Sequence, residues 1–219
     1  MINFAKNLDK IEKKINDYNQ GIKKNRRINI IAVSKTFGQE RVLSALNSGF
    51  YCFGENKVQE AKLKFNDLII KFPKIHLHMI GRLQTNKVKD ALKIFHTIQT
   101  LDREKLGLEI KKTLSAISLT KSFFIQVNIA DEPQKSGISI QDSDDFINWC
   151  KNDLLLNIIG LMCIPPYNED SETYFMQLKE IAIRNNIENL SMGMSSDYIN
   201  AIRCGATHIR LGEALFGKR

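Results

Sequence analysis

A lysine that directly follows a short apolar run is the residue in this sequence best suited to covalent chemistry. Residues 30–33, Ile-Ile-Ala-Val, are typical of a buried strand, and Ser34, Lys35 and Thr36 come next. An amine at the end of a buried strand loses hydration, which favours its neutral form. A neutral lysine is a nucleophile that forms Schiff bases with aldehydes. Lys35 is therefore a candidate for such a bond, although a lysine after a strand is more often an exposed loop residue.

A serine-rich turn near the C-terminal end has the features of an anion-binding site. Residues 190–197 read LSMGMSSD, which predicts a short strand, a turn and the start of a helix. Ser195 and Ser196 both fit the helix N-cap, and Asp197 would lie in the first turn. The free N–H groups of such a turn bind anions, and the hydroxyls add donors. Ordinary helix capping without any ligand is the alternative explanation.

The last expected strand is followed by a similar arrangement. Residues 208–217 read HIRLGEALFG. Arg210 supplies a cation, and Gly212 permits a close approach of the backbone before another helix begins. A surface ion pair would explain Arg210 equally well if it stood alone. Together, the two turns predict a site for a phosphate group.

Apolar runs alternate with helix-like segments along the whole chain. Eight runs are expected to be strands, at residues 28–33, 50–53, 75–80, 95–99, 122–129, 155–162, 188–191 and 207–211. This alternation implies a parallel sheet with helical crossovers, and eight units favour a closed (β/α)8 TIM barrel over an open sheet. In this fold active-site residues follow the strands, and phosphate often binds after strands 7 and 8. Lys35 would then face the phosphate site, and a ligand with both an aldehyde and a phosphate suggests pyridoxal 5′-phosphate.

Composition indicates a single soluble domain. Hydrophobic residues make up 43% of the 219 residues, which is enough for one core, and we expect one domain over residues 1–219. No apolar stretch reaches membrane-spanning length, and the N-terminal residues lack the apolar core of a signal peptide, so a cytoplasmic location is expected. The four cysteines are scattered, which indicates reduced thiols rather than a zinc site or a disulfide framework. His76 and His78 share a strand face, but no third metal ligand is evident.

The formal net charge of +8 is concentrated at the N-terminus. Residues 1–27 contain eight basic and three acidic residues, a surplus of five. Apolar residues recur in this segment at roughly helical spacing, at Ile2, Phe4, Leu8, Ile11, Ile15 and Tyr18. We therefore expect an amphipathic N-terminal helix with a solvated basic face. Nucleic-acid binding by this face is a minor alternative, because charge runs usually mark solvated surface.

Seven motifs in a fixed order carry a resemblance to a known family. They read IAVSKT (31–36), FGENKVQE (53–60), HMIGRLQTNK (78–87), QVNIADEPQKSGI (126–138), GLMCIPP (160–166), LSMGMSSD (190–197) and HIRLGEALFG (208–217). They resemble the motifs of the pyridoxal phosphate homeostasis protein family, the single-domain relatives of the alanine racemase barrel. The resemblance covers nearly the whole chain. The last two motifs are highly specific, whereas each of the others is moderately so.

The resemblance implies a fold similar to the N-terminal barrel of alanine racemase, with pyridoxal 5′-phosphate held as an aldimine on one lysine. It implies a cofactor site made of Lys35, Asn56, Ser191, Met194, Ser195, Arg210, Leu211 and Gly212. In this site Arg210 would contact the phosphate, the pyridine nitrogen or both. Members of the family are thought to store or deliver the cofactor, and no reaction is firmly assigned to them. A non-catalytic carrier, with pyridoxal phosphate-dependent apo-enzymes as recipients, is therefore implied.

Two positions depart from the family pattern. Phe37 and Gly38 follow the SKT motif where many members have a proline, so this loop is expected to be looser. Lys57 replaces the tyrosine of the usual GENYVQE motif, which removes an aromatic ring near Asn56 and adds a charge. Neither change removes a proposed phosphate or aldimine group.

Two enzymatic alternatives stay open. A small racemase or lyase would use the same cofactor but needs a second acid–base group on the opposite face of the ring, which a second domain supplies in alanine racemase. This sequence ends at Arg219, soon after the expected barrel, so we expect no such domain and predict a monomer. The candidates for an internal substitute are Tyr51, Tyr167, Tyr174, Tyr198, His76, His78, His96 and His208. The second alternative is a lysine-dependent aldolase that acts on a sugar phosphate without a cofactor.

Overall fold

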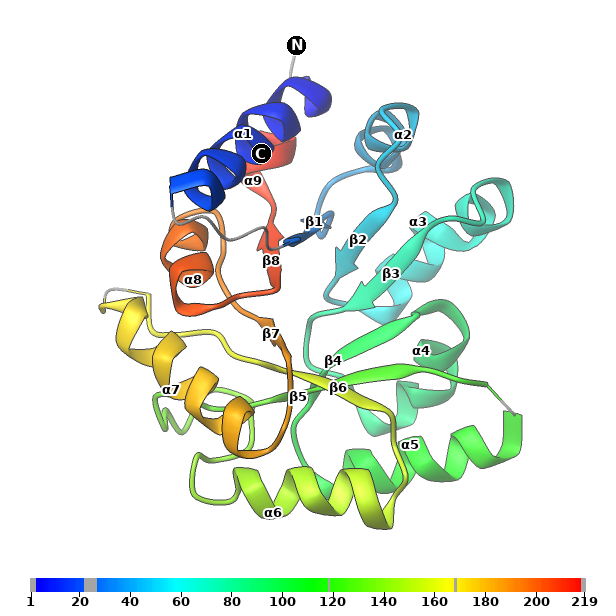
Figure 1. Ribbon diagram of the computed structural model, residues 1–219. Coiled ribbons are helices and arrows are strands. Elements are labelled where there is room, and N and C mark those ends of the chain that lie inside the picture. Colours follow the sequence, from blue (N-terminus) through cyan, green and yellow to red (C-terminus); the bar gives the residue numbers. More distant parts are fainter. Residues whose placement is uncertain (1–2, 22–26, 118, 168, 218–219) are drawn as a thin grey trace.

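Eight parallel strands close into a barrel, and strands that follow one another in the sequence are neighbours in the sheet (Figure 1). The computed structural model describes residues 3–21, 27–117, 119–167 and 169–217. The strands are β1 (Asn29–Val33), β2 (Cys52–Glu55), β3 (His76–Met79), β4 (Thr97–Leu101), β5 (Ser122–Gln126), β6 (Ile158–Met162), β7 (Asn189–Ser191) and β8 (His208–Leu211). Pairing of β1 with β8, from Asn29 opposite His208 to Ala32 opposite Leu211, closes the barrel. The predicted (β/α)8 TIM barrel and its eight strands are confirmed.

Local backbone geometry shortens one of the expected strands. The run 155–162 becomes a strand only at Ile158. Leu155 has a positive φ of 52°, which takes the chain out of the extended conformation at the start of this run. The apolar residues before Ile158 therefore belong to the connection that enters the strand, although their composition is that of a strand.

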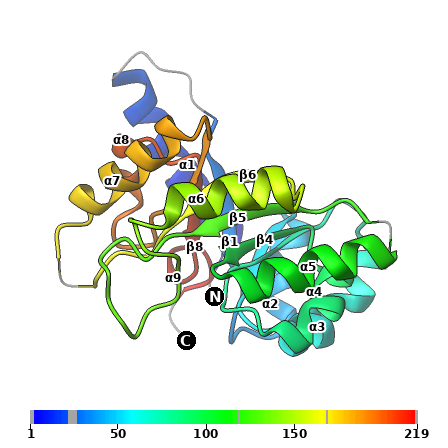
Figure 2. The same ribbon diagram turned by 90° about the horizontal axis from the view of Figure 1, so that it is seen from below.

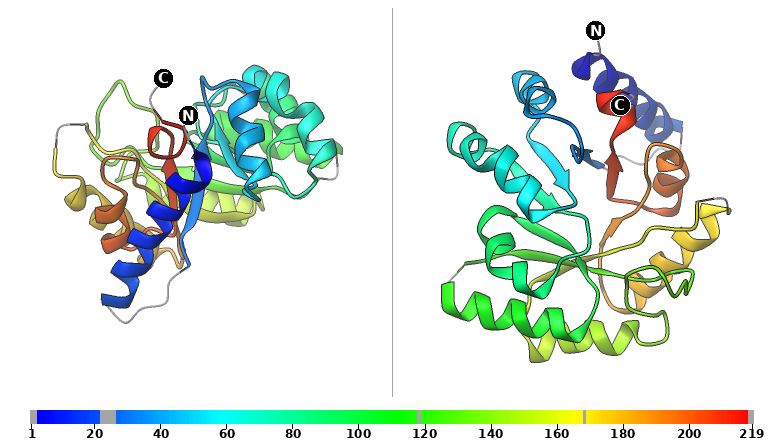
Figure 3. Two further views of the ribbon diagram at one scale, coloured as in Figure 1. Left: turned by 90° about the horizontal axis from the view of Figure 1, so that it is seen from above. Right: turned by 180° about the vertical axis from the view of Figure 1, so that it is seen from behind.

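Helices follow the strands and form an outer layer around the barrel (Figure 3). They are α1 (Phe4–Gly21), α2 (Gln39–Asn47), α3 (Val58–Lys71), η1 (Thr85–Lys87), α4 (Val88–Ile94), α5 (Glu104–Ile117), α6 (Ser143–Asn148), η2 (Trp149–Asp153), α7 (Ser171–Arg184), α8 (Tyr198–Cys204) and α9 (Glu213–Phe216). The helices α3, α4 and α5 lie side by side along one flank, and α7 and α8 lie together on another (Figure 2). Each crossover thereby covers the outer face of the strands it connects.

The expected amphipathic N-terminal helix is confirmed as α1. Its buried residues are Phe4, Ile11 and Ile15, which recur at helical spacing. The ring of Phe4 lies 5.2 Å from the ring of Phe216 in α9, so the first and last helices pack together (Figure 1). Part of the predicted basic and apolar segment lies outside the described residues, namely Ile2, Lys23, Lys24 and Arg26.

Side chains from strands that are not neighbours meet inside the barrel. The ring of His208 on β8 lies 5.2 Å from the ring of Phe124 on β5 and 6.4 Å from the ring of His78 on β3. Gly160 on β6 makes room for Phe124, because a Cβ at this position would lie 2.2 Å from that ring. The interior is therefore a packed core rather than a channel, as is usual for this fold.

The four cysteines are present as free thiols. None of the four cysteines, all of which lie in the described part of the chain, forms a disulfide. Burial raises the pKa values of Cys150 and Cys163 to about 12, so both thiols keep their protons at neutral pH. In the described part of the chain we find no helix long and apolar enough to span a membrane.

All four histidines of the chain gather toward the N-terminal end of the barrel. The ring of His76 lies 4.7 Å from that of His78 and 5.0 Å from that of His96, and His208 completes the group from β8. The described residues include no group of three or more His, Cys, Asp or Glu side chains that could hold a metal ion. The pair formed by His76 and His78 therefore gains no third ligand from its neighbours.

This histidine cluster predicts a loss of stability at mildly acidic pH. Burial lowers the pKa values of His96 and His208 from 6.5 to about 4, and neighbouring positive groups add to the effect. The unfolded chain takes up protons below about pH 6.5, whereas the folded protein excludes them down to about pH 4. The free energy of unfolding should therefore fall as the pH drops through this window, with up to about 3 kcal/mol from the buried His208 alone.

Urea denaturation of the wild type and of a His208→Gln variant measures this dependence. The variant should lose less stability than the wild type between neutral pH and about pH 4, because one proton-binding group is absent from the unfolded chain. The comparison uses the slope of the free energy of unfolding against pH. A loss of stability from repacking that is the same at every pH therefore does not affect it. Equal slopes in the two proteins would contradict the prediction.

Candidate cofactor site

A cavity of about 330 Å³ lies where the strands end and contains most of the predicted site residues. Six of the eight predicted residues line it, namely Lys35, Asn56, Met194, Ser195, Arg210 and Gly212. The other two, Ser191 and Leu211, are fully buried and do not line it. The volume is at the small end of the range of about 300–1,000 Å³ that is usual for ligand sites. Barrel closure thus brings residues that follow β1, β2, β7 and β8 to one place.

The backbone around Lys35 is held from both sides. Lys64 Nζ donates a 2.7 Å hydrogen bond to the carbonyl oxygen of Ser34, and the N–H of Thr36 donates a 2.7 Å bond to Oε1 of Glu60. Thr36 has a positive φ of 66°, which is uncommon for a β-branched residue and persists because these bonds stabilise the turn. Lys35 itself is half-buried and lines the cavity. The sequence indicates where Lys35 lies but not the two side chains of α3 that hold its turn.

Lys64 and Glu55 form a buried ion pair beneath this turn. Lys64 Nζ lies 2.7 Å from Oε1 of Glu55, and the Glu55 side chain is fully buried. The hydroxyl of Ser34 donates a 2.8 Å hydrogen bond to the same oxygen. Burial raises the pKa of Glu55, and the Lys64 ammonium and the Ser34 hydroxyl oppose this shift. The i, i+4 spacing of Glu60 and Lys64 is the one sequence signal for this network, and it does not include Glu55.

Arg210 is a buried cation at the cavity. Its Nη1 group donates a 2.8 Å hydrogen bond to Ser191 Oγ, and its Nη2 group donates a 2.8 Å bond to the carbonyl oxygen of Cys163. It is only 5% exposed and forms no ion pair with any residue that the structure describes. Burial lowers the pKa of Arg210, which reflects the cost of a buried cation without a paired carboxylate. The alternative that Arg210 forms a surface ion pair is therefore wrong. The environment of Arg210 favours an anionic or electron-rich ligand.

A hydrogen-bond chain of fixed direction connects Arg210 to the histidine cluster. Ser191 Oγ donates a 2.7 Å bond to Oε1 of Gln99, and Nε2 of Gln99 lies 3.1 Å from Nδ1 of His78. Because arginine only donates, the Ser191 hydroxyl must donate onward, and the Gln99 amide then donates to His78. His78 is therefore neutral, and burial lowers its pKa well below the usual value. Ser191 contacts Arg210 from the barrel interior, and no sequence pattern points to Gln99.

The serine-rich turn differs from prediction at the start of its helix. α8 begins at Tyr198, and Asp197 occupies the N-cap position in place of Ser195 or Ser196. Oδ1 of Asp197 accepts a 2.6 Å hydrogen bond from the N–H of Met194. A carboxylate is a stronger acceptor than a hydroxyl, and its bond to Met194 carries the turn past both serines before the helix begins. The prediction of serine capping, with Asp197 inside the first turn, is wrong.

The two predicted turns meet at one side of the cavity. Ser195 Oγ accepts a 3.4 Å hydrogen bond from the N–H of Ala214, which follows β8. The N–H groups of Ser195, Ser196 and Gly212 donate no hydrogen bond to the described part of the protein. A Cβ at Gly212 would lie 3.5 Å from the nearest backbone oxygen, so there is open space beside this residue. These free donors, together with Arg210, form a suitable site for a phosphate group.

The remaining wall of the cavity is largely apolar. Its apolar residues are Val33, Phe37, Ile80, Ile164 and Met194, and the exposed Glu213 adds a carboxylate at the edge next to Gly212. An aromatic ring suits such a wall, an aldehyde on the ring would meet the Lys35 amine, and a phosphate would meet the free N–H groups. The side chains present therefore fit pyridoxal 5′-phosphate.

Only one of the proposed acid–base candidates lies at the cavity. Among the described lining residues Tyr167 is the single tyrosine, and its side chain is 90% exposed. Tyr51, Tyr174 and Tyr198 do not line the cavity, and the histidines lie toward the opposite end of the barrel. Among the described lining residues, the site thus contains one phenolic hydroxyl, which is exposed, and the exposed carboxylate of Glu213, but no buried histidine, tyrosine or carboxylic acid.

Comparison with known proteins identifies the class of this barrel. The model of the family "Alanine racemase, N-terminal domain" matches residues 6–219. PipY of Synechococcus elongatus, solved with PLP bound, is 27% identical and superposes with a TM-score of 0.84 over 98% of this chain and 100% of that chain. The chain is thus a barrel of the alanine racemase N-terminal domain class.

Sequence relatives narrow this class to one family. A pyridoxal phosphate homeostasis protein of Pasteurella multocida is 37% identical over 202 residues, which cover 88% of this chain and 87% of the relative. A protein of the same name from Haemophilus influenzae is 34% identical and covers 100% of this chain and 97% of its own. The chain belongs to the pyridoxal phosphate homeostasis protein family, and the resemblance drawn from its motifs is confirmed.

Proposed function

We propose that this chain binds pyridoxal 5′-phosphate as an aldimine on Lys35 and acts in homeostasis of the cofactor as a non-catalytic carrier. The observation that carries the proposal is a single cavity lined by the Lys35 amine, the buried Arg210 and free backbone N–H donors. The names of the relatives and the PLP-bound structure of PipY support it. The amine adds to the aldehyde and water leaves, so the bond is reversible by hydrolysis.

The polar residues that line the cavity have separate parts in this proposal. The N–H groups of Ser195, Ser196 and Gly212 bind the phosphate, and Arg210 places a donor-only cation against the phosphate or the ring nitrogen. Asn56 contacts the ring or its hydroxyl from the loop after β2. Reversible attachment at an open mouth suits storage and release of a reactive aldehyde.

We propose that the loaded protein catalyses no reaction, because Tyr167 is exposed. Racemisation or elimination needs an acid–base group held within hydrogen-bond reach of the reacting carbon. Tyr167 is 90% exposed, and no residue in the described part of the chain holds its hydroxyl with a hydrogen bond. We therefore propose a non-catalytic carrier whose recipients are the apo-forms of pyridoxal phosphate-dependent enzymes. We also propose that it acts inside the cell as a monomer.

Transfer to an apo-enzyme tests the carrier function. We expect the loaded protein to activate an apo-aminotransferase faster than an equal concentration of free cofactor in the presence of a competing free amine, because the bound aldehyde is protected. The same protein with its Schiff base reduced by borohydride is the control and should not transfer. If the loaded protein activates no faster than free cofactor, direct delivery is excluded and sequestration alone remains.

The presence of Tyr167 at the cavity favours a small racemase or lyase as the second candidate. This alternative predicts turnover of an amino acid by the loaded protein, with loss of turnover in Tyr167→Phe. A loaded protein that leaves a panel of amino acids unchanged supports the carrier.

A further inference from the structure

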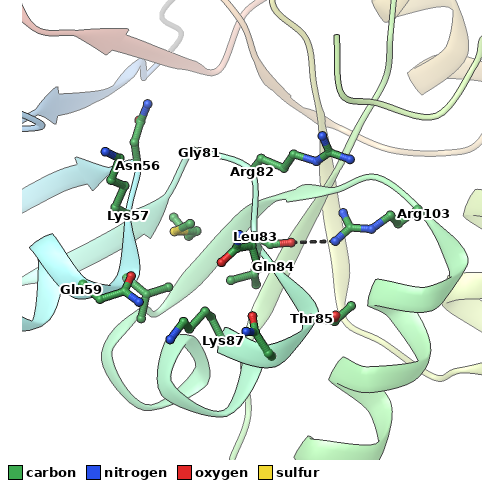
Figure 4. A pocket seen from close by; sticks show the side chains of 13 residues that line it. Asn56, Lys57, Gln59, Gly81, Arg82, Leu83, Gln84, Thr85, Lys87 and Arg103 are labelled. Carbon is green, nitrogen blue, oxygen red and sulfur yellow. Dashed lines mark hydrogen bonds between the residues drawn. The ribbon is translucent and has the colours of Figure 1, made fainter. Parts of the chain in front are cut away.

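A second and larger cavity lies beside the proposed cofactor cavity. Its volume is about 770 Å³, and its walls come from the loops that follow β2, β3 and β4 (Figure 4). Asn56 lines both cavities, so the two are adjacent and share this residue as part of their walls. None of the other residues that line the second cavity has a part in the proposed cofactor site.

The second cavity is strongly basic. Four cationic side chains line it, namely Lys57, Arg82, Lys87 and Arg103, and none of its described lining residues is acidic. Figure 4 shows the amines of Lys57 and Lys87 on one side and the guanidinium groups of Arg82 and Arg103 on the other. Like charges that line one cavity repel each other, so an anion bound in the cavity would stabilise the arrangement.

Three of these cations form no ion pair with the described residues. Arg103 forms an ion pair with Asp102 and donates a 2.8 Å hydrogen bond to the carbonyl oxygen of Leu83, which holds its guanidinium group in place (Figure 4). In contrast, Lys57, Arg82 and Lys87 have no ion-pair partner among the described residues. The lining therefore offers one cation held by an ion pair and three without one, although the charge of Arg82 opposes the rise that burial causes in the pKa of nearby Asp102, and the charge of Lys57 helps to lower the pKa of nearby Glu60.

Neutral donors accompany the cations. The amide side chains of Asn56, Gln59, Gln84 and Asn86 line the cavity, and no hydrogen bond of theirs occurs within the described part of the chain. The wall between the two cavities is closely packed, because a Cβ at Gly81 would lie 2.3 Å from the carbonyl oxygen of Asn56. Thr100 holds Gly81 further through a 2.8 Å bond from Oγ1 to its carbonyl oxygen. The cavity thus has a closely packed wall at Gly81, whereas most of its polar side chains, namely Lys57, Gln59, Arg82, Gln84 and Asn86, are exposed to solvent.

We propose that this basic cavity is a second binding site, specific for a phosphate monoester, in which a non-covalent molecule of phosphorylated cofactor lies beside the one on Lys35. The identity of the bound molecule is inferred from the proposed carrier function. The preference for an anion is inferred from the residues of the cavity alone. A phosphate dianion matches the cations and amides in charge and hydrogen bonding. Asn56, which lines both cavities, places the second molecule beside the cofactor cavity, where it forms a local reserve of the cofactor.

Titration of protein whose Lys35 is already blocked tests this second site. The wild type is loaded with pyridoxal 5′-phosphate, reduced with borohydride and titrated calorimetrically with pyridoxine 5′-phosphate, which lacks an aldehyde and cannot form a Schiff base. We expect one further molecule to bind, more weakly at higher salt, whereas unphosphorylated pyridoxine should not bind. In a Lys57→Gln, Lys87→Gln double variant the affinity should fall at least about tenfold.

Matched controls decide the outcome. A Lys71→Gln, Lys74→Gln double variant has the same charge change at exposed lysines that line neither cavity, and it should bind like the wild type. The proposal would be overturned if no second binding event occurred or if the two double variants bound with equal affinity. It would also be overturned if pyridoxine bound as tightly as its phosphate, or if an RNA oligonucleotide bound but pyridoxine 5′-phosphate did not. If no cofactor is fixed on Lys35, the carrier function fails, and the same titration on unreduced protein still tests the anion site.

Discussion

A Lys35→Ala variant is expected to lose covalent binding of pyridoxal 5′-phosphate completely. Lys35 is the lysine that lines the proposed cofactor cavity, and its turn is held by Lys64 and Glu60 on both sides. Without this amine no Schiff base can form in the cavity, although the phosphate site stays intact. The visible spectrum of the purified variant after addition of the cofactor should therefore show no aldimine band. The measurement compares it directly with the wild type.

Two further variants make this test specific. Lys35→Arg keeps a positive charge but removes the nucleophilic amine, so it should also lack the band. Lys57→Ala changes a lysine of the neighbouring cavity and should keep the band. An aldimine band of wild-type intensity in Lys35→Ala would show that another lysine carries the cofactor.

The largest loss of stability is expected from Lys64→Met. This change leaves the carboxylate of Glu55 fully buried without its cation and removes the bond to the carbonyl oxygen of Ser34. Removing one partner of a buried ion pair typically costs about 3–5 kcal/mol, which is a large part of the total stability of about 5–15 kcal/mol for a domain. Urea denaturation of the protein without cofactor measures the loss. The same variant should bind the cofactor less tightly, because the turn that positions Lys35 is loosened.

An exposed ion pair gives the matched control. Lys62 lies 3.2 Å from Asp90, and both side chains are 42% exposed, so Lys62→Met should change stability by less than about 1 kcal/mol. Combining Lys64→Met with Glu55→Gln should restore part of the loss, because the buried negative charge is then gone. If Lys64→Met and Lys62→Met cost the same, the buried pair does not have the role we assign to it.

Strands and the lysine could be predicted because their sequence signals are local. In a parallel barrel the strands are buried on both faces, so most of them are rich in apolar residues, and the run 30–33 is continuous. Lys35 stands out because it follows such a run, and Arg210 because it lies within one. The eight strands and their order follow from this alternation without any knowledge of tertiary contacts.

The polar network of the barrel interior could not be predicted because its members come together only when the barrel closes. Gln99 on β4, Ser191 on β7 and Arg210 on β8 form consecutive hydrogen bonds across the interior. Each of these residues lies in an apolar strand, where sequence alone gives no information about its partner. The same holds for His208, which meets His78 from the other side of the barrel.

The serine-rich turn shows a different limit of sequence reasoning. Ser195, Ser196 and Asp197 are all good N-cap residues, so the local pattern does not distinguish among them. The choice falls on Asp197, whose carboxylate accepts the N–H of Met194. One consequence is that the N–H groups of both serines stay free, which favours the phosphate site more than serine capping would.

The most direct test of the central claim is borohydride reduction of the wild-type protein with pyridoxal 5′-phosphate, followed by mass spectrometric mapping of the modified peptide. The account predicts an aldimine band before reduction and one covalently attached cofactor, on the peptide that contains Lys35. Absence of the band even with excess cofactor would contradict the account and favour an aldolase that uses Lys35 without a cofactor. Attachment to other lysines with Lys35 unmodified would contradict the assignment of the site.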